Sequence, residues 1–79
     1  MNVSEAIENI KKAIHQAPRN NYTVELHVQM IKYADLFEDL TGREFCEILG
    51  LSPPWAIEFN KMRKISTRLQ NAGLDLDKI

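Results

Sequence analysis

The stretch TGREFCEILGLS, residues 41–52, constrains the fold more than any other part of the chain. Thr41 is followed three residues later by Glu44. This is the spacing of a capping box, in which each side chain bonds the backbone amide of the other residue and fixes the start of a helix. Gly50 suits the left-handed conformation that ends a helix and turns the chain sharply. The stretch therefore predicts a short helix between Thr41 and Gly50, followed closely by another helix.

Positions in and after this stretch meet the requirements of a helix-turn-helix. Cys46 is small where the second helix would cross the first, and Gly50 accepts the positive φ of the turn. Ala56 and Phe59 then supply apolar residues that face back toward the first helix. An ordinary helical corner could carry the same string. Of the two, we expect the helix-turn-helix geometry, with Phe45, Ile48 and Leu49 facing inward from its first helix.

Apolar periodicity predicts two earlier helices and no strand. Ser4 can cap the first helix, and its inward stripe is Ile7, Ile10, Ile14 and Ala17 before Pro18 ends it. Thr23 can cap the next helix, which we expect to run to about Asp39. This second helix has too many apolar residues for one narrow stripe, so we expect it to be central and to pack on its neighbours, with a second copy of the chain as a further candidate.

The fourth predicted helix begins at Ser52, whose side chain can cap it, with Pro53 tolerated at its first position. Its inward stripe is Ala56, Phe59, Met62, Ile65 and Leu69, and Gly73 ends it. The sequence thus predicts an all-α fold, a compact bundle of four helices whose third and fourth helices form the helix-turn-helix-like corner. We expect one domain over residues 1–79, with 72–79 as a short tail whose Leu74, Leu76 and Ile79 are available for docking.

Several kinds of function are not expected from the composition. The chain has 79 residues and a single cysteine, so it has no internal disulfide framework, and His15 and His27 beside Cys46 do not make a zinc site. We find no phosphate-binding loop or paired carboxylates, and therefore expect no enzyme, cofactor or small-molecule substrate. No apolar run approaches the ~20 residues of a membrane span, and the N-terminus has no signal-like core, which favours a cytoplasmic protein. A monomer of this size buries only about 60% of its unfolded surface, which favours a homodimer.

The charge distribution points weakly to nucleic acid. The net charge is -1, whereas small DNA-binding domains are usually basic. However, residues 59–68 include four basic residues and no acidic one. Lys61, Lys64 and Arg68 are spaced by three and four, so they share one helix face, and Arg43 lies where the first helix of the motif crosses the DNA backbone. These side chains are candidates for phosphate contacts, with a merely solvated face as the alternative.

Base reading is less well supported. The solvent-facing positions at the start of the fourth helix are Ser52, Pro53, Pro54, Ile57, Glu58 and Lys61. Sequence-specific readout needs bidentate donors and acceptors such as Arg or Asn. Prolines and isoleucine offer only apolar contact, and Glu58 would repel phosphates. Ser52 remains a candidate contact to the backbone or a base at the helix entry.

A resemblance to known proteins supports the fold. The run GREFCEILGLS resembles the first helix and turn of repressor-type helix-turn-helix proteins. The run from Ala17 to Ile65 resembles a family of small bacterial helix-turn-helix-like proteins, through AP at 17–18, ELHVQMIKYA at 25–34, EILGLS at 47–52 and EFNKMRKI at 58–65. The resemblance implies an all-α domain in a bacterial or phage regulatory setting, with no catalytic residues.

Two functions follow from these observations, and a dimeric structural subunit that acts through its second helix is a third alternative. The first is a DNA-binding transcriptional regulator that contacts duplex DNA mainly through phosphates, using Arg43, Ser52, Lys61, Lys64 and Arg68. The alternative is a protein-interaction module, such as an antirepressor, an antitoxin-like protein or a regulatory subunit, that presents Pro53, Pro54, Trp55 and Ile57 to a partner. Trp55 can be a core plug or, if exposed, an interface anchor. His27 is interpreted as a half-buried packing residue.

Overall fold

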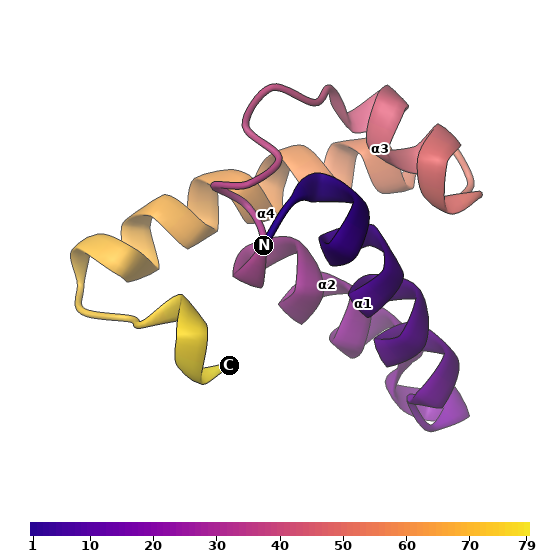
Figure 1. The fold of residues 1–79 in the computed structure, drawn as a ribbon, viewed down its shortest axis with the longest axis horizontal. Coiled ribbons are helices and arrows are strands. Elements are labelled where there is room, and N and C mark those ends of the chain that lie inside the picture. Colours follow the sequence, from indigo (N-terminus) through magenta and orange to yellow (C-terminus); the bar gives the residue numbers. More distant parts are fainter.

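The chain folds into four α-helices and two short 3₁₀ turns, without a strand (Figure 1). In the computed structural model, which describes residues 1–79, the helices are α1 (Val3–Gln16), α2 (Tyr22–Lys32), α3 (Gly42–Leu49) and α4 (Trp55–Asn71). The 3₁₀ turns are η1 (Arg19–Asn21) and η2 (Leu76–Lys78). The predicted all-α class, with its third and fourth helices packed together, is confirmed. None of the helices has the length and apolar character needed to span a membrane.

The cap of α1 lies two residues before the predicted one. Asn2, not Ser4, caps the helix, because its side-chain Oδ1 accepts a 2.8 Å hydrogen bond from the Glu5 amide. The inward stripe is as predicted over most of the helix: Ile7 and Ile10 are buried, and Ile14 packs against the core from its edge.

The second helix is shorter than the sequence predicts. The apolar pattern extends it from Thr23 to about Asp39, but α2 ends at Lys32, and residues 33–40 form a series of turns. The predicted cap by Thr23 is also wrong, because α2 begins at Tyr22 and no side chain caps it. Tyr33 leaves the helical conformation, with φ -106° and ψ 14°. The turns let Phe37 reach the centre of the core while Leu36 and Leu40 pack at its margin.

Arg63 on α4 holds these turns in place. Its Nη1 donates to the backbone carbonyls of Phe37, Glu38 and Leu40 at 3.1, 3.3 and 2.8 Å. Its guanidinium also lies over the Phe59 ring, 4.6 Å from the ring centre, and donates to Asn60. Three backbone carbonyls of the turns that follow α2 therefore accept hydrogen bonds from a side chain of another helix.

The core is aromatic at its centre. Phe45 from α3 and Phe59 from α4 stack with ring centres 4.2 Å apart, and Phe37 lies tilted against both. All three side chains are fully buried, together with Ile10, Leu26 and Met30. The core therefore joins all four helices and the turns between α2 and α3.

The inward stripe predicted for α4 is wrong in its second half. Ala56, Phe59 and Met62 face the interior, but Ile65 and Leu69 are about two-fifths exposed. The fully buried residue at this level is Ser66, whose Oγ donates a 2.9 Å hydrogen bond to the carbonyl of Ile31 near the end of α2. A small hydroxyl side chain lets α2 and α4 approach closely, and its bond supplements the 3.4 Å bond that the Ile31 carbonyl accepts from the Ala34 amide.

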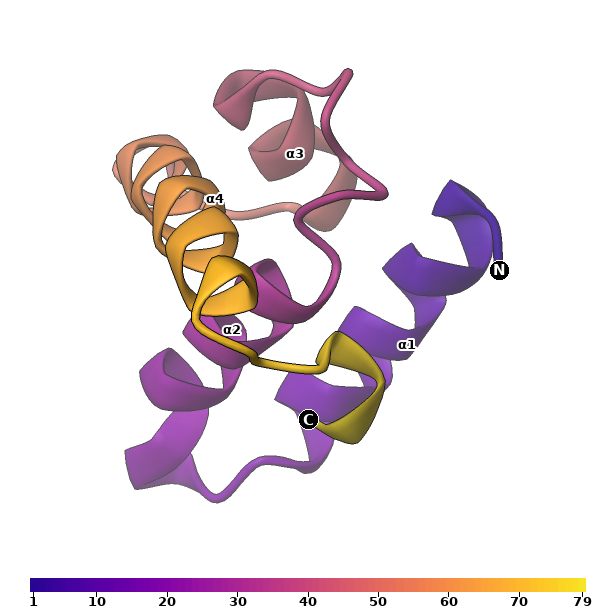
Figure 2. The ribbon, with the colours of Figure 1, turned by 90° about the vertical axis from the view of Figure 1, so that its left-hand side faces the viewer.

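The C-terminal residues fold back on the molecule. Beyond α4 the chain turns at Gly73, and η2 packs against α2 (Figure 2). Leu76 lines a hollow of about 640 Å³ together with Tyr33 and Leu36, so part of the tail predicted to be available for docking is already docked within its own chain.

Candidate nucleic-acid interface

The corner between α3 and α4 begins with the predicted capping box. The Thr41 hydroxyl accepts from the Glu44 amide at 3.1 Å, and the Glu44 carboxylate accepts from the Thr41 amide at 2.9 Å. The bond from the Thr41 backbone amide, followed by that from its side chain, lowers the pKa of Glu44 below its ordinary value of 4.5. The box fixes where α3 starts relative to the turns that Arg63 holds.

The two helices approach each other closely at Gly42. A Cβ at Gly42 would lie 2.6 Å from the Ala56 carbonyl oxygen and 3.0 Å from its Cα, distances that a side chain does not tolerate. Cys46, one turn further along α3, is buried as predicted, and burial raises the pKa of its thiol. The raised pKa favours the unreactive thiol over the thiolate.

The turn has the predicted left-handed glycine, but α4 does not begin in the way that the sequence predicts. Gly50 has φ 68° and ψ 32°, and the Leu51 amide donates back to the Cys46 carbonyl at 2.9 Å. The predicted side-chain cap of α4 by Ser52 is wrong. Instead the Ser52 carbonyl accepts from the Trp55 amide at 3.1 Å, in a turn formed by Pro53 and Pro54. The Ala56 and Ile57 amides donate in the same way to the Pro53 and Pro54 carbonyls, so α4 begins with a tight turn of bonds between residues three apart.

Trp55 is half-buried and ties the start of α4 to α2. Its ring lies 6.4 Å from Tyr22 in a T-shaped arrangement and 5.5 Å from His27. His27 in turn places Nε2 3.7 Å from the Glu58 carboxylate. This makes Trp55 mainly a packing residue, and His27 is a half-buried neighbour of α4, as interpreted from the sequence.

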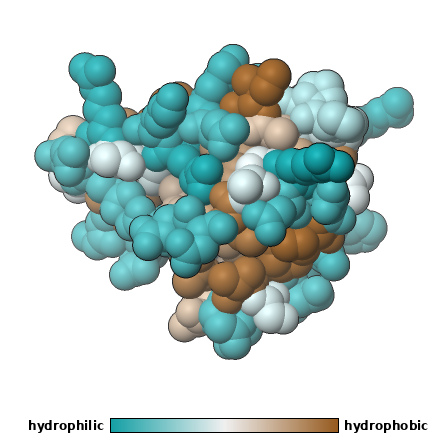
Figure 3. Space-filling view, turned by 90° about the horizontal axis from the view of Figure 1, so that it is seen from above, coloured by the Kyte–Doolittle hydropathy of each residue, from teal (hydrophilic) through white to brown (hydrophobic).

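An apolar surface remains where α4 begins. Pro53 and Pro54 are exposed, and Ile57 is 61% exposed on the first turn of the helix. On α3, outside this surface, Ile48 is 45% exposed, although the sequence predicts that it faces inward. Seen from above, the molecule is largely hydrophilic, but apolar side chains form one broad continuous area at the lower right of the view and a smaller one at the top (Figure 3).

Three of the predicted phosphate contacts are free side chains. Lys61, Lys64 and Arg68 are exposed on α4 and take part in none of the ion pairs of the chain. Arg43 is also exposed, but its Nε lies 3.2 Å from the Glu47 carboxylate on the same helix. Arg63, in the middle of the basic run, is occupied by the backbone carbonyls of the turns between α2 and α3.

A hollow lies in the corner itself, between α3 and the start of α4. Its volume is about 550 Å³, and its lining includes Cys46, Leu51 and Ala56, with Arg43, Glu47 and Pro53. Arg43 and the proline turn therefore lie beside the same depression. The hollow contains no cluster of metal-binding side chains, and the chain as a whole has none.

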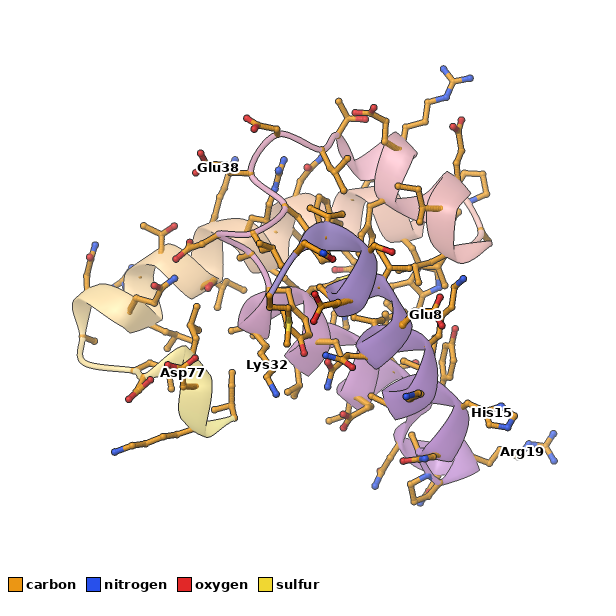
Figure 4. The ribbon with its side chains drawn as sticks, in the orientation of Figure 1. Glu8, His15, Arg19, Lys32, Glu38 and Asp77 are labelled. Carbon is orange, nitrogen blue, oxygen red and sulfur yellow. The ribbon has the colours of Figure 1, made fainter.

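A second basic cluster lies away from this corner, and no sequence motif marks it. Lys12, His15 and Arg19 are exposed at the C-terminal end of α1 and in η1. Figure 4 shows His15 and Arg19 projecting into solvent at the end of the molecule opposite to α3. Lys12 and Arg19 of this cluster, together with the exposed Lys78 of η2, offer a matched control for the charges on α4.

The arrangement of α3, the glycine turn and α4 is that of a helix-turn-helix-like corner. A family model described as an HTH-like domain matches residues 2–72, and the chain belongs to this family. No curated protein and no solved structure matches the chain significantly. The matched region covers all four helices, so the family includes α1 and α2 as well as the corner.

Proposed function

We propose that this protein is a small DNA-binding transcriptional regulator of bacterial or phage origin that acts in the cytoplasm and contacts duplex DNA mainly through phosphates. The observation that carries the proposal is the exposed face of α4, where Lys61, Lys64 and Arg68 have no acidic partner. Unpaired cations at three- and four-residue spacing follow one side of a helix that the HTH-like fold exposes. Arg43 and Ser52 would add contacts from the corner.

The proposed binding is weakly selective for sequence. Pro53, Pro54 and Ile57 occupy the positions from which related motifs read base edges, and they offer no hydrogen bonds to bases. Phosphate contacts give an affinity that falls with salt, with a slope of about -0.9 in log K per phosphate neutralised. Three contacts from α4 thus predict a slope of about -3, and a contact from Arg43 would raise its magnitude toward about 4.

Charge reversal tests the proposal against a matched control. We expect the triple variant Lys61→Glu, Lys64→Glu, Arg68→Glu to lose measurable binding to random duplex DNA at low salt. The control variant Lys12→Glu, Arg19→Glu, Lys78→Glu changes the net charge by the same amount at exposed positions away from the α4 face. Fluorescence anisotropy measures both. Equal losses in the two variants would show that only net charge matters and would contradict a site on α4.

The exposed proline turn favours a second candidate function, a protein-interaction module. Pro53, Pro54 and Ile57 form a rigid apolar surface, whereas Trp55, part of the same candidate set, already packs on α2. A protein partner held by this surface would be released by Ile57→Glu and kept by Ile48→Glu, which changes a comparably exposed isoleucine on α3. Release by both variants, or by neither, would count against this function.

A further inference from the structure

The contact between His27 of α2 and Glu58 of α4 contains a buried polar atom without a partner. The Nε2 atom of His27 is buried and takes part in no hydrogen bond. The Oε2 atom of Glu58 lies 3.7 Å from it, which is beyond hydrogen-bonding distance. Because a buried polar group without a partner costs free energy, a small movement that joins these two atoms is favoured.

Protonation of His27 supplies the attraction for that movement. The rest of the ring is not closed off, because 29% of the side chain is exposed, and a proton can reach Nδ1 from solvent. The imidazolium ion carries a proton on each nitrogen, so its Nε2–H group faces Glu58 as a charged donor. Charge-assisted bonds of this kind are about 2.7–2.9 Å long, so the cation draws the two side chains together by about 1 Å.

Glu58 is the acidic side chain that faces His27 most closely. On α2 itself, the Glu25 carboxylate accepts a 2.8 Å hydrogen bond from Gln29 instead. On α4, the next charged residue after Glu58 is Lys61, which is exposed and takes part in no ion pair. The charged side chains that α1, η1 and η2 bring to α2 line other hollows or are exposed: Lys11, His15, Arg19, Asp77 and Lys78.

The contact lies where α4 begins and beside the proposed phosphate surface. Trp55 is the first residue of α4, and its ring lies 5.5 Å from the His27 ring. Glu58 is one turn into the helix and three residues before Lys61, so these two side chains share one side of α4. The charge of Glu58 therefore repels phosphates that Lys61 would contact, and a cationic partner cancels that repulsion.

We propose that His27 is a pH-sensitive switch that pairs with Glu58 when it is protonated, fixing the start of α4 against α2 and strengthening the binding of DNA phosphates. Imidazole changes its charge between about pH 5 and 8, so the pair forms as pH falls through this range and is lost as pH rises. The effect on phosphates rests on the proposed DNA binding, whereas the pairing itself does not.

A double-mutant cycle on the DNA-free chain tests the pairing. Urea unfolding of wild type, His27→Gln, Glu58→Gln and the double variant is measured at about pH 5.5 and about pH 8. At the lower pH we expect the two losses of stability to be non-additive by about three- to tenfold in the unfolding equilibrium constant, because each single change removes the same ion pair. At the higher pH we expect them to add. Coupling that is equal at both pH values, or absent at both, would overturn the switch.

The control and a second measurement use the other histidine and the single tryptophan. His15→Gln changes a histidine that projects into solvent (Figure 4), and its effect on stability should add to that of Glu58→Gln at both pH values. Trp55 is the only tryptophan, and an imidazolium quenches a neighbouring indole more strongly than neutral imidazole does. We therefore expect the emission of wild type and of His15→Gln to fall as pH is lowered through the imidazole range. Unchanged wild-type emission would overturn the proposal even if a His27 variant does not fold.

The affinity for random duplex DNA at constant low salt tests the consequence for binding. Between the higher and the lower pH we expect the affinity of wild type and of His15→Gln to rise about three- to fivefold. His27→Gln should stay at the weaker level and Glu58→Gln at the stronger level at both pH values. An equal rise in His27→Gln and wild type would overturn the effect on DNA. Absence of binding at both pH values would instead contradict the proposed function, and the double-mutant cycle would still decide the pairing.

Discussion

At Gly42, the packing of α3 against α4 leaves no room for a side chain. A methyl group there would collide with the Ala56 backbone, which cannot move without shifting α4. We expect Gly42→Ala to lower the free energy of unfolding by about 1–3 kcal/mol, because overpacking outweighs the gain of at most about 1 kcal/mol in helix propensity. Chemical denaturation at one protein concentration measures the change. The exposed control Lys12→Ala should stay within about 0.5 kcal/mol, and equal stability of Gly42→Ala and wild type would disprove the close crossing.

A second prediction concerns the contacts of Arg63. Its guanidinium serves three backbone carbonyls and the Phe59 ring at once, and a lysine ammonium cannot reproduce this planar arrangement. We expect Arg63→Lys to destabilise the fold by about 1–2 kcal/mol and to speed hydrogen exchange in residues 33–41. The adjacent Lys64→Ala should change neither quantity. Unchanged exchange in Arg63→Lys would contradict the role of this side chain.

The residues whose roles could be predicted from the sequence are those with local partners. Thr41 and Glu44 bond each other, and Gly50 needs only its own φ, so their roles follow from spacing alone. Arg63 and Ser66 bind backbone carbonyls 23 to 35 residues away, and no local pattern marks such partners. The role of Gly42 could have been found from the sequence, because a glycine directly after a helix cap is unusual. The sequence analysis instead assigned the small residue of the helix crossing to Cys46, as in other helix-turn-helix motifs.

At the scale of the element, α3 should have a stability that depends on pH through its capping box. Because the pKa of Glu44 is lower in the folded state, its ionised carboxylate stabilises the fold above the ordinary value of 4.5, and this contribution is lost as pH falls through the lower folded value. We expect the melting temperature of wild type to exceed that of Glu44→Gln near neutral pH and to converge with it in acid. Measurement by circular dichroism across this range checks the sign. A difference that stays constant with pH would contradict a stabilising role of the ionised carboxylate.

The helices also differ in how well their ends can be predicted. The third helix is placed well because its cap and its terminal glycine are both local signals. The second is extended too far, since apolar residues continue to Leu40 and no proline or glycine interrupts them. The end of α2 is instead determined by tertiary contacts, in which Arg63 and Ser66 satisfy carbonyls near and beyond its end. The same contacts turn Ile65 and Leu69 outward.

At the scale of the whole molecule, α4 has two different sides. Its inner side completes the core, and its basic side is the proposed phosphate surface. The HTH-like fold could be predicted from residues 41–59, and the family match over residues 2–72 confirms that class. The identity of the surface that binds a partner could not be predicted, because exposure depends on how α2 and α4 are rotated against each other.

The central claim, DNA binding through the cations of α4, is tested most directly by the salt dependence of binding to random duplex DNA. Anisotropy titrations of the wild-type chain at two or more salt concentrations give the slope of log K against log salt. We predict binding at low salt with a slope of about -3 to -4 that is lost in the Lys61, Lys64, Arg68 charge-reversal variant. No binding at low salt, or binding whose slope is the same in that variant, would contradict the claim.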